Sequence, residues 1–94
     1  MEFYPGFAMK AAVLLVRLTK NHALPDGNKR TALAVTIAFC DVNGFDWVPP
    51  TGDDPGGEET YRLMLAIAAA PGTDLEAVEA EVAAWIAERL HQRK

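Results

Sequence analysis

The stretch Lys20–Ala34, with the sequence KNHALPDGNKRTALA, ends one apolar run of the chain and begins another. The Pro-Asp-Gly tripeptide at residues 25–27 contains residue types that favour a tight turn. Residues 7–21 repeat apolar side chains at helical spacing before the stretch, and residues 28–43 do so after it. The stretch therefore predicts two helices joined by a short polar loop.

The rest of the chain predicts two more helices. A third helix is expected from about Glu58 to Ala70. Thr73 and Glu76 match a capping box, with Thr73 as the N-cap of a last helix that runs from Asp74 to about His91. Residues 45–48 favour a short extended piece. The predicted fold class is all-α, with about four helices and the polar loop between the first two.

The composition bounds the class of protein. The 94 residues fit one small domain, residues 1–94, and half of them are hydrophobic, which leaves apolar surface for a partner. The net charge of −4 gives no general attraction for nucleic acid. The start of the chain is acidic and unlike a signal peptide, and the apolar run at residues 11–16 is too short to cross a membrane. We expect a cytoplasmic protein without a membrane segment.

Four single residues carry smaller expectations. Cys40 is the one cysteine and is predicted to be a small buried hydrophobe. Trp85 is predicted to lie in the core, whereas Trp47 could either contact a partner or cover the core. We expect no role for His91.

The charge of the chain reverses around the polar loop. Four of the nine basic residues fall within fourteen positions, at Arg17, Lys20, Lys29 and Arg30, and Asp26 is the only acidic residue among them. A basic segment in an acidic protein indicates a site for an anion.

The start of the second predicted helix has the features of a phosphate site. Its first N–H groups, at Gly27 and Asn28, lack helical partners and point towards an anion, and Gly27 allows close approach. Lys29 and Arg30 add charge-assisted hydrogen bonds. Each residue alone also fits a simpler role as a turn, a cap or a solvated face.

Two further residues complete the set needed for phosphoryl transfer. Asp26 is a suitable ligand for Mg²⁺, which takes one or two carboxylates beside bound phosphates. His22 is the candidate general base near neutral pH. Base, metal ligand, backbone donors and cations together favour a phosphoryl-transfer site over coincidence.

At residues 22–32 the sequence HALPDGNKRTA resembles the Fic/Doc signature, written H-x-F-x-[D/N]-[A/G]-N-K-R for the Doc branch. Lys29 selects the Doc branch, and the other residues that fit in register are His22, Asp26, Gly27, Asn28 and Arg30. The sequence departs from the signature at Leu24, which replaces a Phe, and Leu33 stands where the Fic branch has a second Arg.

The resemblance implies an all-helical toxin of a toxin–antitoxin pair that uses ATP and Mg²⁺. It would be a protein kinase that transfers the γ-phosphate to a hydroxyl of a translation elongation factor and arrests translation. By the same resemblance His22 deprotonates the hydroxyl and Asp26 holds Mg²⁺, while the phosphates are bound by Gly27, Asn28, Lys29 and Arg30. The partners implied are the elongation factor and an antitoxin whose helical segment occupies an apolar groove.

Other functions remain as alternatives. The first is a Fic-type AMP transferase. The second is an inactive remnant that only binds an antitoxin, because relatives carry further N-terminal helices and a target-docking flap, whereas 21 residues precede His22 here. The chain would then be a fragment or a shortened member. A DNA-binding helix-turn-helix is disfavoured by the net charge, and the oligomeric state is left open.

Overall fold

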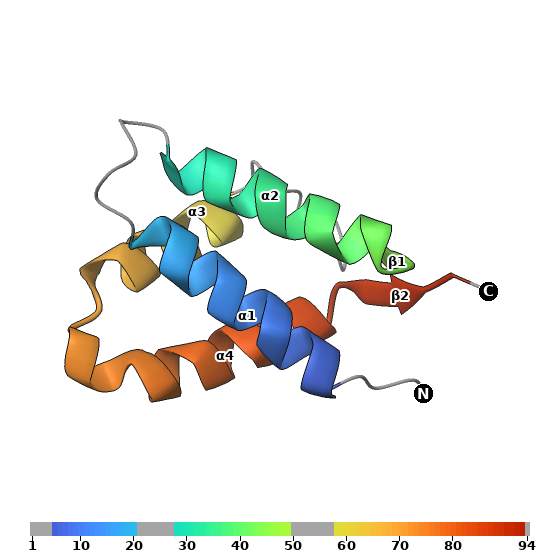
Figure 1. Cartoon of the computed structure of the whole chain (residues 1–94). Helices are drawn as coiled ribbons and strands as arrows, with labels where there is room; N and C mark the ends of the chain where they lie inside the picture. The colour runs from blue at the N-terminus through green and yellow to red at the C-terminus, as the bar shows by residue number, and fades with distance from the viewer. Residues whose placement is uncertain (1–4, 21–27, 50–57, 94) are drawn as a thin grey trace.

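The computed structural model describes residues 5–20, 28–49 and 58–93, and within them the chain is mainly helical (Figure 1). Four α-helices are present in these residues: α1 (Pro5–Thr19), α2 (Asn28–Val42), α3 (Glu58–Ala69) and α4 (Leu75–Ala87). A short 3-10 helix, η1 (Gly72–Asp74), precedes α4. The prediction of an all-α domain with four helices is confirmed, and the extended piece predicted at residues 45–48 is present as a short strand, whereas a second short strand near the C-terminus was not predicted.

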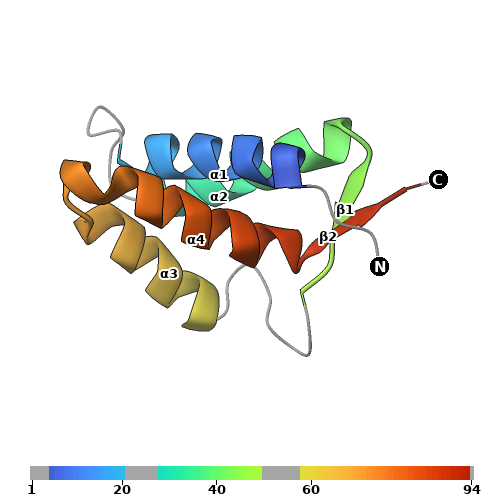
Figure 2. The same ribbon diagram turned by 90° about the horizontal axis from the view of Figure 1, so that it is seen from below.

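Helix α1 is the centre of the domain. It lies between α2 and α4 and also contacts α3 (Figure 1). Figure 2 shows α1 and α4 side by side, with α3 beyond α4. The buried face of α1 is built mainly from small residues, which let the neighbouring helices approach closely; its members are Ala8, Ala11, Ala12, Leu15 and Val16. A helix that is apolar on most sides is expected at such a central position.

Two strands close the other end of the domain. β1 (Phe45–Trp47) pairs antiparallel with β2 (Leu90–Gln92), so that Asp46 lies opposite His91. Gly44 has a φ of 89° in the turn between α2 and β1, a left-handed conformation that favours glycine. The pairing brings the C-terminal end of the described chain back to the end of α2 (Figure 1).

The predicted last helix begins within one residue of the predicted start, but its C-terminal end and its N-cap are wrong. It does not continue to His91, since α4 ends at Ala87 and residues 90–92 form β2. Hydrogen bonding to β1, which is distant in sequence, outweighs the local helical pattern there. The capping box is also absent, because Thr73 lies inside η1 and Asp74, with no side-chain cap hydrogen bond, is the N-cap of α4. The Asp74 N–H donates to the Pro71 carbonyl at 3.0 Å, so the chain is already coiled at Thr73.

The predictions for three side chains have clear outcomes. Cys40 is fully buried, as predicted, and burial raises the pKa of its thiol to about 11. Trp85 is buried in the core, as predicted. Trp47 is half-buried and packs edge-on against Trp85 with ring centroids 5.5 Å apart, so it covers the core while keeping one side towards solvent. None of the described helices is long and apolar enough to cross a membrane.

Candidate functional site

The structure describes some of the predicted site residues and not others. His22, Asp26 and Gly27 lie outside the described residues, so their roles stay predictions. Asn28, Lys29 and Arg30 form the first turn of α2, where the sequence predicted a helix start. The Arg30 side chain is exposed and therefore accessible to a ligand.

The first turn of α2 is electrostatically suited to an anion. Its backbone N–H groups have no acceptor within the helix, and the helix dipole makes this end positive. The turn contains no acidic residue but does contain Lys29 and Arg30. Cations at the positive end of a helix are unfavourable by roughly 0.3–1 kcal/mol each, and a bound anion would reverse the sign of that interaction. The first turn of α2 is therefore suited to an anion.

The helices on either side of the site are held firmly. At the end of α1 the Thr19 hydroxyl is buried and donates to the Leu15 carbonyl at 2.7 Å. Near the start of α2, Ala32 and Thr36 are fully buried, and the Thr36 hydroxyl donates to the Ala32 carbonyl at 2.8 Å. Both helices therefore present their loop-side ends from fixed positions in the core, as α1 and α2 run side by side (Figure 1).

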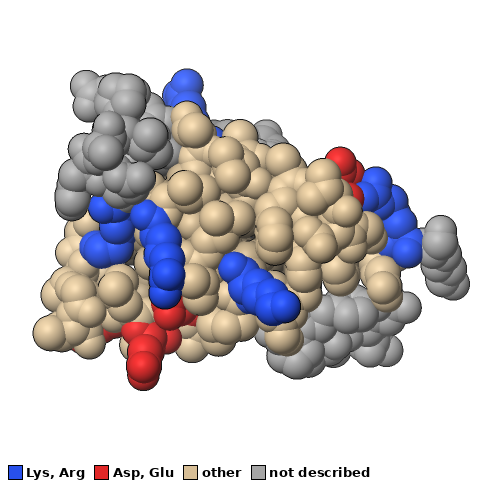
Figure 3. Space-filling view, viewed as in Figure 1, with Lys and Arg blue, Asp and Glu red and all other residues tan. Residues whose placement is uncertain are grey.

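Lys20 has a different environment from the one its sequence position suggested. Its Nζ donates to the Ile67 carbonyl at 3.3 Å and to the Ala70 carbonyl at 2.5 Å, both at the C-terminal end of α3. Arg17 and Arg30, which lie nearest the loop in sequence, are exposed, and so are Lys10 on α1 and Arg62 on α3. In Figure 3, basic side chains gather over α1, whereas the visible acidic side chains lie towards the edges of this face. Of the four basic residues predicted around the loop, Arg17 and Arg30 are therefore exposed, whereas Lys20 binds carbonyls at the end of α3 and the Lys29 side chain lies outside the described part of the structure.

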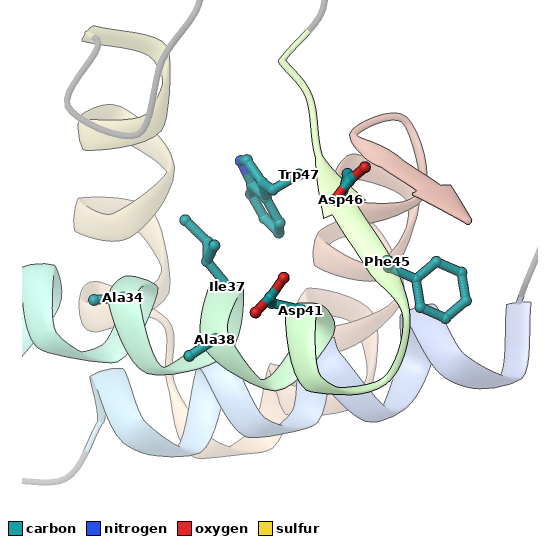
Figure 4. A pocket seen from close by; sticks show the side chains of 7 residues that line it. All are labelled: Ala34, Ile37, Ala38, Asp41, Phe45, Asp46 and Trp47. Carbon is teal, nitrogen blue, oxygen red and sulfur yellow. The ribbon is translucent and has the colours of Figure 1, made fainter. Parts of the chain in front are cut away.

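A second feature, which the sequence analysis missed, is a hollow between α2 and β1 (Figure 4). It has a volume of about 480 Å³ and is lined by Ala34, Ile37, Ala38, Asp41, Phe45, Asp46 and Trp47. In Figure 4, Ile37 and Trp47 point into the hollow, while the Phe45 ring lies on the far side of β1. We call this feature the α2–β1 hollow.

Charge and apolar surface meet at the α2–β1 hollow. Arg93 pairs with Asp41 at 3.0 Å and with Asp46 at 3.6 Å, so the two carboxylates are held at its edge. The outer face of α2 beside it exposes Val35 and Val42, the latter 79% exposed. The spacing of Val35, Ala38 and Val42 on one helical face was the sequence signal for this surface. Among the described residues there is no cluster of three or more His, Cys, Asp or Glu that could hold a metal.

Comparisons with known proteins match the part of the chain that contains the motif. Residues 1–40, which contain the motif and most of α1 and α2, match the family model described as the Fic/DOC family. This match and the motif at residues 22–32 support a Doc-like member of the family. It is 38% identical over 87 residues to Toxin Doc of Mycolicibacterium smegmatis (strain ATCC 700084 / mc(2)155), and the alignment covers 93% of the chain. The chain spans 63% of the length of that toxin. No solved structure matches the chain significantly.

Proposed function

We propose that the chain is a Doc-like toxin of a toxin–antitoxin system, and that it acts as a protein kinase on a hydroxyl of a translation elongation factor. The observation that carries this proposal is the first turn of α2, which contains the last residues of the motif and combines the N–H groups of a helix start with Lys29 and Arg30. The likeness to Toxin Doc supports the toxin class. Because ATP and the elongation factor are cytoplasmic, we place the activity in the cytoplasm.

In the proposed reaction, His22 accepts the proton of the target hydroxyl as its oxygen attacks the γ-phosphorus of ATP. The bond between the γ-phosphorus and the β–γ bridging oxygen breaks, and ADP leaves with the displaced electron pair. Arg30 and Lys29, with the N–H groups of Gly27 and Asn28, stabilise the negative charge on the phosphates. Asp26 would hold Mg²⁺, which neutralises phosphate charge when it is bound.

A labelled-nucleotide assay tests this proposal. Purified protein is incubated with elongation factor and ATP labelled at either the α- or the γ-phosphate, beside a His22→Ala variant. We expect label on the elongation factor from the γ-position alone, and its loss in His22→Ala. Label from the α-position alone would replace the kinase by the Fic-type AMP transferase. Label from neither position would favour the inactive remnant.

We also propose that the outer face of α2 and the α2–β1 hollow receive a helical segment of the antitoxin. The surface is apolar at Val35, Val42 and Trp47, so it suits the apolar face of a partner helix. An amphipathic helix in a groove is a common mode of recognition for such a surface.

The antitoxin site has a direct test. Val42→Lys changes a side chain that is 79% exposed, so the fold should be unaffected while binding of a co-purified antitoxin falls by more than about tenfold. Leu65→Lys is the matched control, since Leu65 is an exposed hydrophobic residue of α3. Equal affinities of the two variants, measured by calorimetry, would place the antitoxin elsewhere.

A further inference from the structure

The turn between α2 and β1 contains the dipeptide Asn43–Gly44. Asn43 is exposed, and it is the one asparagine of the chain that precedes a glycine, since Asn21 and Asn28 precede His22 and Lys29. An asparagine before glycine is especially prone to deamidation, because the backbone nitrogen of a residue without a side chain can approach the asparagine amide closely. The sequence therefore singles out Asn43 for this chemistry.

In the folded protein both reacting groups are held by hydrogen bonds. The Asn43 side-chain amide donates from Nδ2 to the Phe39 carbonyl at 2.8 Å. The Gly44 N–H, whose nitrogen would attack that amide, donates to the Asp41 carbonyl at 3.0 Å. The Gly44 bond must break before the nitrogen can reach Cγ of Asn43, so the reaction requires a local opening of the turn.

Arg93 holds this turn closed from the other end of the described chain. Its backbone N–H donates to the Gly44 carbonyl at 2.8 Å, and its guanidinium donates to the Asp41 carbonyl. The guanidinium also pairs with the carboxylates of Asp41 at 3.0 Å and Asp46 at 3.6 Å. The Arg93 side chain is 44% exposed, so water weakens these charged contacts. The turn is therefore fastened by contacts that local fluctuations of the C-terminal segment release.

We propose that Asn43 is a deamidation site whose reaction proceeds through opening of the α2–β1 turn, and that Arg93 slows it by holding the turn closed. The Gly44 backbone nitrogen loses its proton to solvent and forms a bond to Cγ of Asn43. The bond between Cγ and Nδ2 breaks, and Nδ2 takes up a proton and leaves as ammonia, which gives a cyclic imide. Water then adds to either imide carbonyl and opens the ring to aspartate or isoaspartate. The net reaction consumes one water and releases one ammonia, without oxidation or reduction.

Either product alters the α2–β1 hollow. The new carboxylate lies just after α2, where the helix dipole disfavours a negative charge, and close in sequence to the carboxylate of Asp41. Isoaspartate also lengthens the backbone shortly before β1, the strand that places Trp47 in the lining of the hollow. This surface is the one proposed for the antitoxin, so the effect of deamidation on antitoxin binding rests on the proposed function, whereas the reaction itself does not.

Peptide mapping by mass spectrometry tests the reaction. The folded protein is incubated at mildly alkaline pH, and the peptide of residues 39–48 gives the rate in the absence of the fold. We expect the amide of Asn43 to become a carboxylate in the protein, more slowly than in the peptide, while Asn21 and Asn28 stay unchanged over the same period. No conversion of the protein while the peptide converts fully would overturn the site, and equal rates in the two would overturn the control by the turn.

Arg93→Met tests the role of the C-terminal contacts, with Arg17→Met, an exposed arginine on α1, as the matched control. We expect Arg93→Met to accelerate conversion of Asn43 by roughly three- to tenfold, because partly exposed charged contacts are lost from the closed turn. Hydrogen exchange of the Gly44 N–H should accelerate by a similar factor, and Arg17→Met should change neither rate. Wild-type rates in Arg93→Met would overturn the role of Arg93. If Arg93→Met does not fold, judged by circular dichroism, Arg93→Lys, which lacks the planar fork of donors, replaces it.

The consequence for the antitoxin is measured separately. Asn43→Asp reproduces one product and should bind a co-purified antitoxin more weakly than the wild type. Asn43→Gln, which does not form the five-membered imide, should bind as the wild type does. Equal affinities of the two variants, with conversion of Asn43 intact, would contradict the proposed antitoxin surface and leave the deamidation site in place.

Discussion

Replacing Arg89 by methionine tests which interaction secures the region where β2 begins. The guanidinium is almost fully buried, with 1% of the residue exposed, and its central carbon lies 3.9 Å from the centroid of the Trp85 ring. Nη1 donates to the Trp85 carbonyl at 2.9 Å. Nη2 lies 3.3 Å from Oε1 of Glu59, near the start of α3. Nη1 also lies 3.9 Å from Oε1 of Glu88. The stack, the hydrogen bond and the pair with Glu59 are the contacts whose contributions this substitution compares.

Their magnitudes differ. A desolvated cation–π stack contributes about 2 kcal/mol, and a hydrogen bond from a charged donor about 1.5–3 kcal/mol. The pair with Glu59 contributes about 0.2–1 kcal/mol, because the carboxylate side chain is 64% exposed and screened by water. Methionine recovers part of the loss, since it fills similar space and needs no burial of charge. We expect Arg89→Met to lower the free energy of unfolding by about 2 kcal/mol and Glu59→Gln by less than about 1 kcal/mol.

Urea unfolding followed by circular dichroism measures both losses. For a domain of this size, about 1 kcal/mol corresponds to about 4–8 °C in Tm, so Arg89→Met should melt about 8–16 °C lower. Arg17→Met, an exposed arginine on α1, is the control and should change little. Equal losses for Arg89→Met and Glu59→Gln, both abolished at high salt, would refute the reasoning. They would show that the ion pair, and not the stack on Trp85, stabilises this region.

Three other predictions follow from buried or strained positions. Gly44→Ala should destabilise the protein by about 1–2 kcal/mol in urea unfolding, because an L-residue is strained at a φ of 89° although its Cβ would meet no atom within 4 Å. Burial raises the pKa of the Cys40 thiol from 9.0 to about 11. The contribution of the buried neutral thiol to the free energy of unfolding is therefore complete below pH 9. That contribution should be lost as the pH rises towards 11, and this loss should be absent from Cys40→Ala. Leu15→Ala should lower the free energy of unfolding by about 2–5 kcal/mol, because Leu15 is fully buried. The same change at Leu65, which is 42% exposed, should lower it far less. Equal Tm values for the two variants would contradict the assignment of Leu15 to the core.

The early part of the chain could be predicted closely because its signals are local. The apolar repeat of α1 and the turn residues after it depend on neighbours a few positions away. α1 begins at Pro5, two residues before the predicted start, since proline is well suited to the first turn of a helix. α2 begins at Asn28, the residue the sequence indicated. The motif could also be recognised from the sequence alone, because its residues lie close together along the chain.

The later part was predicted less well because distant segments compete with local preference. Thr73 and Glu76 have the spacing of a capping box, yet the chain after Pro71 coils into η1. Residues 90–92 continue a helical pattern, yet they pair with β1. The α2–β1 hollow depends on the same pairing, which holds Trp47 opposite Ile37 (Figure 4). The residue pattern of β1 does not indicate that it pairs with β2, and the pattern of β2 does not indicate that it pairs with β1.

The sequence by itself determined the helical class, the two helices that flank the motif and the residue types available for phosphate chemistry, because these depend on local periodicity and on consecutive residues. The tertiary structure alone decided which groups three of the charged side chains contact. Arg89 is buried on Trp85, Arg93 holds the edge of the hollow, and Lys20 caps α3 instead of remaining free beside the loop. The physical reason is that a charged side chain goes to the acceptors that folding brings within reach, and those acceptors lie 4 to 52 residues away in sequence.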